Sequence, residues 1–214
     1  IKNAKNFCEE NEIELEIIKF KEEFGMSLDR MIKKLKKERP CTICGVLRRH
    51  LLNKYSKVYK FDKLATGHNL DDEAESILMN QFRRNVETSA RLGPITGIVK
   101  DPRFVRRIKP LYFMMKNEVK VYAKIKKIKA DSAKCPYAIN SFRYEVRKVL
   151  NTLEEKYPGT KYSVIASFLE ILPLLKEKYK IETKIKSCKI CGEPCAMEVC
   201  KACLILRDLG VKKF

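Results

Sequence analysis

Four cysteines near the carboxyl end constrain the fold of this chain more than any other feature. They form two Cys-x-x-Cys pairs that are separated by eight residues, at Cys188, Cys191, Cys200 and Cys203. Four thiolates in two such turns suit a tetrahedral zinc ion, and a closed site of this kind holds a fold together without doing chemistry. A short segment buries little core, so we expect residues 184–214 to form a small zinc ribbon that is stabilised by its metal.

A third Cys-x-x-Cys pair lies far upstream, at Cys41 and Cys44, and Cys135-Pro136 follows much later. On a helix, residues three apart share one face, so both thiols of the pair point the same way. Cys135 is a candidate third ligand, because Cys-Pro is a common end of an iron–sulfur motif. Three thiolates would leave one iron of a four-iron cluster open. A buried helical cysteine pair, a redox dithiol and a second zinc site are the alternatives.

The chain is strongly basic, with 46 Lys and Arg against 27 Asp and Glu among 214 residues, a net charge of +19. A charge of this size favours a polyanionic partner, most often a nucleic acid, and the alternative is the lysine-rich surface of a thermostable protein. No apolar run is long enough to span a membrane, and no secretory leader is visible, so we expect a cytoplasmic location. The sequence opens at Ile1 in mid-pattern, so we expect it to be part of a longer protein.

Hydrophobic periodicity predicts strands that alternate with helices, the pattern of a parallel α/β sheet. The predicted strands are 13–20, 64–66 and 104–108, and the segment 83–103 is predicted as loop. The predicted helices are 27–39, 41–54, 70–82, 116–128, 141–156 and 161–178, the last kinked near Pro173. We expect an α/β domain over residues 1–140, a helical segment over 141–183 and the zinc ribbon over 184–214.

The segment Ala65-Thr-Gly-His-Asn-Leu-Asp-Asp72 ends a short strand and begins a helix. Ligands of parallel α/β sheets sit at the carboxyl ends of strands, so Gly67, His68 and Asp72 are candidates for binding a nucleotide, magnesium or a substrate carbonyl. The alternative is plain helix capping by Asn69 with acids in the first turn. Arg48 follows Cys44 by one helical turn and could hold an anion there, or it is a solvated basic residue.

These motifs, in this order, resemble the tRNA 2-thiolation enzymes, the family of cytoplasmic tRNA 2-thiolation protein 1 and the tRNA-5-methyluridine 2-sulfurtransferase TtuA. The resemblance rests on four stretches besides the ribbon. They are Cys-x-x-Cys-Gly-x-x-Arg-Arg at 41–49, Ala-Thr-Gly-His-Asn-Leu-Asp-Asp-Glu-Ala at 65–74, Lys-Pro-Leu…Lys-Asn-Glu-Val-Lys-Val-Tyr-Ala at 109–123, and Cys135-Pro-Tyr.

The resemblance implies an adenine-nucleotide α-hydrolase-like fold, that of the PP-loop ATP pyrophosphatases. It implies a [4Fe-4S] cluster on Cys41, Cys44 and Cys135, zinc on the carboxyl-terminal quartet, and ATP with Mg²⁺ near Gly67 and His68. Asp72 matches a position proposed as catalytic. Arg48 stands where TtuA-like members carry a lysine proposed as catalytic, so we expect an electrostatic role for it rather than proton transfer.

The resemblance also implies a reaction and its partners. ATP would adenylate O2 of a tRNA uridine, and sulfur from the open iron would then replace that oxygen. The sulfur donor would be a ubiquitin-like carrier protein or free sulfide, and the enzyme a homodimer. The family's Ser-Gly-Gly-x-Asp-Ser phosphate loop and its amino-terminal zinc module would precede Ile1, so we expect both to be missing. The alternatives are another adenylating enzyme of this fold, such as lysidine synthetase, and a non-catalytic RNA-binding protein stabilised by metals.

Overall fold

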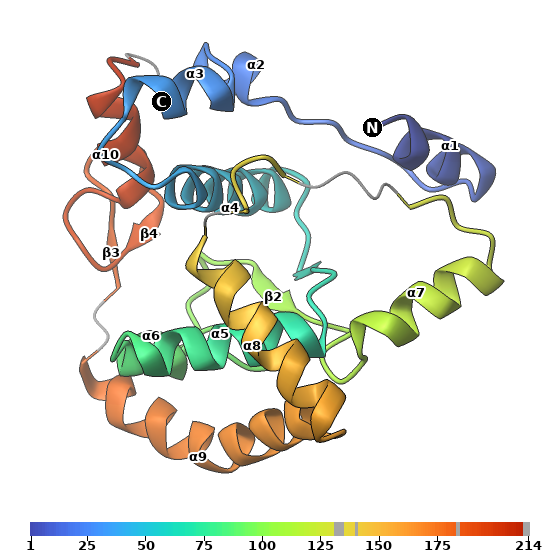
Figure 1. Ribbon diagram of the computed structural model, residues 1–214. Coiled ribbons are helices and arrows are strands. Elements are labelled where there is room, and N and C mark those ends of the chain that lie inside the picture. Colours follow the sequence, from blue (N-terminus) through green and yellow to red (C-terminus); the bar gives the residue numbers. More distant parts are fainter. Residues whose placement is uncertain (131–134, 140, 183–184, 212–214) are drawn as a thin grey trace.

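The computed structural model describes residues 1–130, 135–139, 141–182 and 185–211. Helices dominate, and two short two-stranded sheets accompany them (Figure 1). In chain order the elements are α1 (Lys2–Glu10), α2 (Phe20–Phe24), α3 (Leu28–Lys34), α4 (Pro40–Val58), β1 (Lys63–Ala65), α5 (Leu70–Phe82), α6 (Val86–Ala90), β2 (Arg106–Ile108), α7 (Lys116–Ile125), α8 (Phe142–Lys156), α9 (Thr160–Glu182), β3 (Lys186–Ser187), β4 (Pro194–Cys195) and α10 (Lys201–Asp208). None of these helices is both long and apolar enough to cross a bilayer.

The parallel sheet predicted from the sequence is present in its central part. Strands β1 and β2 pair in parallel, with Leu64 opposite Arg107. The helices α2, α3, α4 and α10 lie on one side of this pair, and α5, α6, α8 and α9 lie on the other (Figure 1). Parallel strands need a long crossover, which here contains α5 and α6. The chain therefore has the layered α/β arrangement that the alternating pattern predicts.

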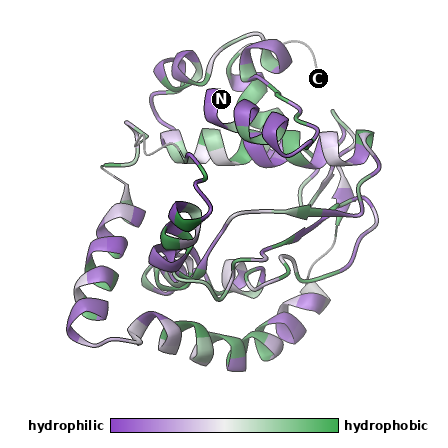
Figure 2. Cartoon of the chain, turned by 90° about the vertical axis from the view of Figure 1, so that its right-hand side faces the viewer, coloured by the Kyte–Doolittle hydropathy of each residue, from purple (hydrophilic) through white to green (hydrophobic). Residues whose placement is uncertain are grey.

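Each side of the sheet has its own hydrophobic core. The first core joins α3, α4 and α10, and Met31, Ile43 and Leu206 are fully buried in it. The second core joins α5, α8 and α9. Hydrophobic and hydrophilic residues alternate along these helices, as one-sided packing requires (Figure 2). Each core contains residues from more than one of the three predicted domains. The division into the segments 1–140, 141–183 and 184–214 therefore stays a prediction.

Helix ends follow the local sequence. Asn69 caps α5 by accepting a hydrogen bond from the Asp72 backbone N–H at 3.1 Å, and Ser141 caps α8 in the same way at 3.2 Å. Pro40 stands at the first position of α4, where a missing N–H costs nothing. Helix α5 has the bounds that the sequence predicts, and Pro173 lies inside α9.

Several predictions of secondary structure were wrong. Residues 13–19 are extended but pair with no described strand, and the segment predicted as loop contains α6. Helix α3 ends at Lys34, earlier than expected. The helical periodicity of 116–128 and 70–82 also predicts that Ile125 and Phe82 lie on inner faces, but these side chains are 72% and 63% exposed. Periodicity shows that a helix has an apolar face, but not whether that face is covered.

We predict that Gly93→Ala destabilises the fold by about 2–4 kcal/mol. Gly93 has a φ of +114°, and a Cβ there would lie 2.9 Å from Cδ2 of Leu172 in α9. Gly25→Ala is the matched control, because Gly25 has a φ of +72° with nothing within 4 Å, and should cost only about 1–2 kcal/mol. Urea unfolding followed by circular dichroism measures both, and equal losses would show that the Leu172 contact does not matter.

Candidate functional site

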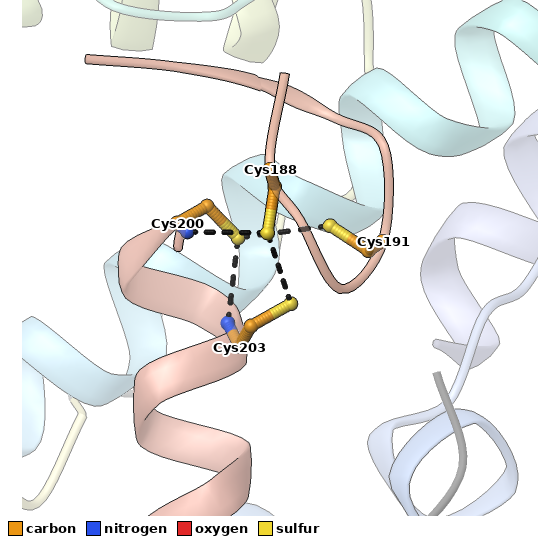
Figure 3. A group of neighbouring side chains, drawn as sticks. All are labelled: Cys188, Cys191, Cys200 and Cys203. Carbon is orange, nitrogen blue, oxygen red and sulfur yellow. Dashed lines mark hydrogen bonds between the residues drawn. The ribbon is translucent and has the colours of Figure 1, made fainter. Parts of the chain in front are cut away.

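The structure gathers the four carboxyl-terminal cysteines into one cluster (Figure 3). The four Sγ atoms all lie within 4.8 Å of one another. Two of the separations are 3.8 Å, between Cys188 and Cys203, and 3.7 Å, between Cys191 and Cys200. A tetrahedron with metal–sulfur bonds of about 2.3 Å places its sulfurs about 3.8 Å apart, so the donor set fits one tetrahedral ion. No other group of three or more metal-ligating side chains is this close in the described part of the chain.

The surroundings of these thiols favour a bound cation. Burial alone would raise the pKa of the Cys188 thiol. Backbone N–H groups that donate to its sulfur, among them those of Cys200 and Ile190, outweigh burial and lower this pKa to about 6. Burial raises the pKa of Cys191 to about 11 and also raises that of Cys203. Four thiolates this close together repel one another unless a cation neutralises them, so the geometry of the quartet fits a bound metal ion. Cys195 lies outside it and donates to the Met197 carbonyl at 2.8 Å.

The ribbon is fastened to α4. Its Glu193 accepts a hydrogen bond from Asn53 at 2.5 Å and forms an ion pair with Lys57. Cys188, Cys200 and Cys203 belong to the same hydrophobic core as the buried residues of α4. The carboxyl-terminal cluster therefore supports α4, the helix that carries Cys41 and Cys44.

Cys41 and Cys44 lie in the first turns of α4, where Cys41 is exposed and Cys44 is half-buried. Their spacing puts both on one face, as predicted, and exposed Arg48 follows one turn later. Cys135 is also exposed. The hydroxyl of Tyr137, two residues on, donates to Asp29 of α3 at 2.6 Å, which ties the Cys135 turn to the helix preceding α4.

The loop between β1 and α5 carries the candidate nucleotide residues. Gly67 and His68 are both exposed directly after β1. The Nδ1 atom of His68 lies 2.9 Å from Oγ1 of Thr66, whose own contact is the Ile108 carbonyl at the end of β2. Partial desolvation of the imidazole by its neighbours lowers the pKa of His68, although the residue as a whole is exposed, so the neutral form is favoured at pH 7. A neutral ring at the carboxyl end of a parallel strand can accept or donate a hydrogen bond to a ligand.

The two adjacent carboxylates of α5 have different tasks. Asp71 is fully engaged, because its oxygens accept from the Lys116 backbone N–H at 2.7 Å and from Nζ of Lys161 at 2.6 Å. Asp72 closes a capping box, in which its Oδ2 accepts from the Asn69 N–H at 3.2 Å. The capping interpretation is thus confirmed for Asn69, but Asp72 has one oxygen that accepts no hydrogen bond from the residues that the structure describes. Of the pair, only Asp72 has an oxygen available for a ligand.

A buried ion pair that sequence reasoning missed lies directly below these residues. Nζ of Lys109, just after β2, contacts Oε1 of Glu73 at 2.7 Å, and the two side chains are 5% and 3% exposed. Removing one member of such a pair costs about 3–5 kcal/mol, because the other charge is left buried. Two sequence features could have indicated this pair. Lys109 directly follows the apolar end of a predicted strand, and a run of acids begins the helix that follows the other predicted strand.

We predict that the pKa of His68 lies below its ordinary value of 6.5, because packing around the ring disfavours the charged form. Protonation then favours the unfolded chain, so His68 lowers stability as the pH falls through 6.5 and its effect is complete below the folded-state pKa. Titration followed by nuclear magnetic resonance, with His68→Gln to assign the signal, measures this value. A pKa at or above 6.5 would contradict the description of the site.

Comparison with known proteins identifies the family. The profile of the PP-loop domain matches residues 1–155. A probable sulfurtransferase of Methanocaldococcus jannaschii is 41% identical over 207 residues, which are 94% of this chain and 59% of that protein. The tRNA-5-methyluridine(54) 2-sulfurtransferase of Pyrococcus horikoshii is 37% identical over 211 residues, 98% of this chain and 65% of that protein. The chain thus spans about three fifths of the length of these relatives.

A solved structure agrees with this result. The U34-tRNA thiolase NcsA from Methanococcus maripaludis, solved with its [4Fe-4S] cluster, superposes with a TM-score of 0.81 at 39% identity, over 99% of this chain and 66% of that one. The expectation that the chain lacks the PP-loop finds no support, because the PP-loop domain profile covers residues 1–155, although Ser-Gly-Gly-x-Asp-Ser does not occur among the 214 residues. The chain belongs to the PP-loop domain family.

Proposed function

We propose that this chain forms the catalytic part of an ATP-dependent tRNA 2-thiolation sulfurtransferase. The observation that carries the proposal is the placement of Cys41 and Cys44 on one face of α4, with the Cys135 turn bound through Tyr137 to the adjacent α3. The related U34-tRNA thiolase and the tRNA-5-methyluridine(54) 2-sulfurtransferase both act on tRNA uridines, as their names state. The substrate class is therefore a tRNA uridine.

The three thiols suit an iron–sulfur cluster better than a single ion. They are not within single-ion distance of one another, unlike the carboxyl-terminal quartet. All three are at least partly accessible, which assembly of a cluster requires. Thiolates are the ligands of such clusters, so Cys41, Cys44 and Cys135 would hold a [4Fe-4S] group as its only protein ligands. When bound, the group supplies an iron without a protein ligand that can carry sulfur.

The remaining candidates are assigned by their charge and accessibility. Arg48, exposed one turn after Cys44, holds negative charge from phosphate or sulfide near the cluster. Gly67 and neutral His68 contact ATP at the end of β1, where both residues are exposed to solvent. Asp72 offers its free oxygen to Mg²⁺ or takes up a proton. In this arrangement ATP adenylates O2 of the uridine with release of pyrophosphate, and sulfide-level sulfur would then bond to C2 and displace AMP, which carries the former O2 away.

The basic surface and the ribbon suit the tRNA partner. A net charge of +19 supplies a sequence-independent attraction for the phosphate backbone. We propose zinc as the ion of the Cys188 cluster, because four thiolates in a tetrahedron are its usual structural site. The sulfur source is a ubiquitin-like carrier protein or free sulfide, and the enzyme acts as a homodimer in the cytoplasm.

We predict that replacing Cys41, Cys44 or Cys135 with alanine lowers tRNA thiolation by more than about 100-fold, since losing a cluster ligand should cost at least as much as losing an outer-sphere partner. Mass spectrometry of nucleosides measures the product, and iron analysis after anaerobic reconstitution measures the cluster. Iron should fall from about four atoms per chain to near zero in each variant. Cys8→Ala is the control, since Cys8 lies in α1 away from these thiols, and activity retained by any of the three variants would refute the assignment.

Zinc should be held by the quartet alone. We expect about one zinc per chain in the unaltered protein, near zero in Cys200→Ser, and an unchanged content in Cys195→Ser. Because the cluster lies in the same core as α4, Cys200→Ser should also lower the melting temperature by several degrees. Metal analysis and thermal unfolding test this, and zinc loss in Cys195→Ser would show that the ligand set is wrong.

A further inference from the structure

A cavity lies apart from the residues proposed to take part in thiolation. A cavity of about 970 Å³ opens between α4, the segment 95–107 that leads into β2, and the ribbon. None of the residues proposed to hold ATP, magnesium or the iron–sulfur cluster lines it. Leu64 of β1 and Arg106 and Arg107 of β2 reach it, whereas Gly67 and His68 follow the carboxyl end of β1.

The charge on the cavity wall is strongly positive. The two carboxylates on the wall are already neutralised from outside it, Asp101 by Arg103 at 2.6 Å and Glu193 by Lys57. Five cationic side chains on the wall have no ion pair or side-chain hydrogen bond within the described residues. They are Arg49, Lys100, Arg106, Arg107 and Lys176. Unpaired cations that converge on one cavity are the usual basis of an anion site.

The guanidinium groups of Arg49 and Arg107 lie close enough to repel one another. Arg49 folds back along α4 over Gly45, where an added Cβ would lie 3.4 Å from its Nη1 atom. Burial, and then the like charge of Arg107, lowers the pKa of Arg49, while burial alone lowers that of Arg107. Burial and the neighbouring Arg106 lower the pKa of Lys176. Bringing these charges together costs repulsion, which a bound anion relieves.

Part of the wall is apolar and includes Ile98, Val99 and Phe104. A flat ring can lie against such a wall, and Phe104 is partly exposed for stacking. The volume falls within the range of small-ligand cavities. We propose that this cavity binds a nucleoside phosphate, with the phosphate on Arg49 and Arg107 and the base against the apolar wall. This nucleotide is either a free molecule or one residue of an RNA chain. The second alternative rests on the proposed function, in which the substrate is a tRNA.

The test compares two double variants that remove the same charge. Arg49→Gln with Arg107→Gln removes the phosphate ligands, and Arg30→Gln with Lys33→Gln removes two exposed cations of α3. Calorimetric titration with AMP gives the number of binding sites, and fluorescence anisotropy with an unmodified tRNA transcript gives affinity at several salt concentrations. Neither probe requires turnover, so failure of the thiolation proposal would leave both readouts intact.

Two results support the proposal and distinguish the source. Loss of one AMP site in the Arg49 and Arg107 variant, with tRNA affinity unchanged, assigns a free nucleotide. In the same variant, at least a tenfold loss of tRNA affinity assigns an RNA nucleotide. The slope of the logarithm of the binding constant against the logarithm of the salt concentration should then become shallower by about one to two. The α3 variant should change either quantity less than about threefold.

Unchanged AMP stoichiometry and unchanged tRNA affinity in the Arg49 and Arg107 variant would overturn the proposal. Circular dichroism and zinc content establish that the variant is folded, which matters because Cys200 also borders the cavity. If the double variant does not fold, the single substitution Arg107→Gln decides the question. A loss of at least fivefold in affinity for either probe supports the site, and unchanged binding of both refutes it.

Discussion

Three carboxylates on the first turns of α5 hold the rest of the structure in position. Asp71 bonds to Lys161 of α9, Glu73 to Lys109 after β2, and Glu75 to two arginines of α8. The Glu75 side chain is 3% exposed. It accepts hydrogen bonds from Nε and Nη2 of Arg147, at 2.6 and 3.0 Å. Buried carboxylates must be paired in this way to be tolerated. One helix end thus fixes the strand and both helices beside it, and Asp72 is placed among them.

Much of this fold could be predicted from the sequence, because local signals governed it. Helix α5 has the predicted bounds since Asn69 is a strong cap and the apolar spacing is regular. The cysteine quartet meets in space because two tight turns leave its sulfurs little freedom. In both places, residues near in sequence determined the structure, so no knowledge of distant contacts was needed.

The parts that could not be predicted depend on distant residues. Residues 13–19 have the alternation of a strand, but pairing needs a neighbour, and periodicity does not reveal whether one is present. The cationic cavity is formed by α4, β2 and the ribbon, whose arginines and lysines read only as charge in the sequence. The separate tasks of Asp71 and Asp72 also required coordinates, since Lys161 lies 90 residues away.

The two cores differ in how far apart along the chain their members lie. The core of α5, α8 and α9 is built from residues 70–172, whereas the core of α4 needs both Met31 and Leu206. Lys34 even donates to the carbonyl of Leu209 at 2.9 Å, across 175 positions. On a ribosome, the core of α5, α8 and α9 can assemble once residue 172 has emerged, but the core of α4 also needs the later residues of α10. During synthesis the core of α5, α8 and α9 can therefore fold before the core of α4, and the cysteine quartet can close only with the later of the two.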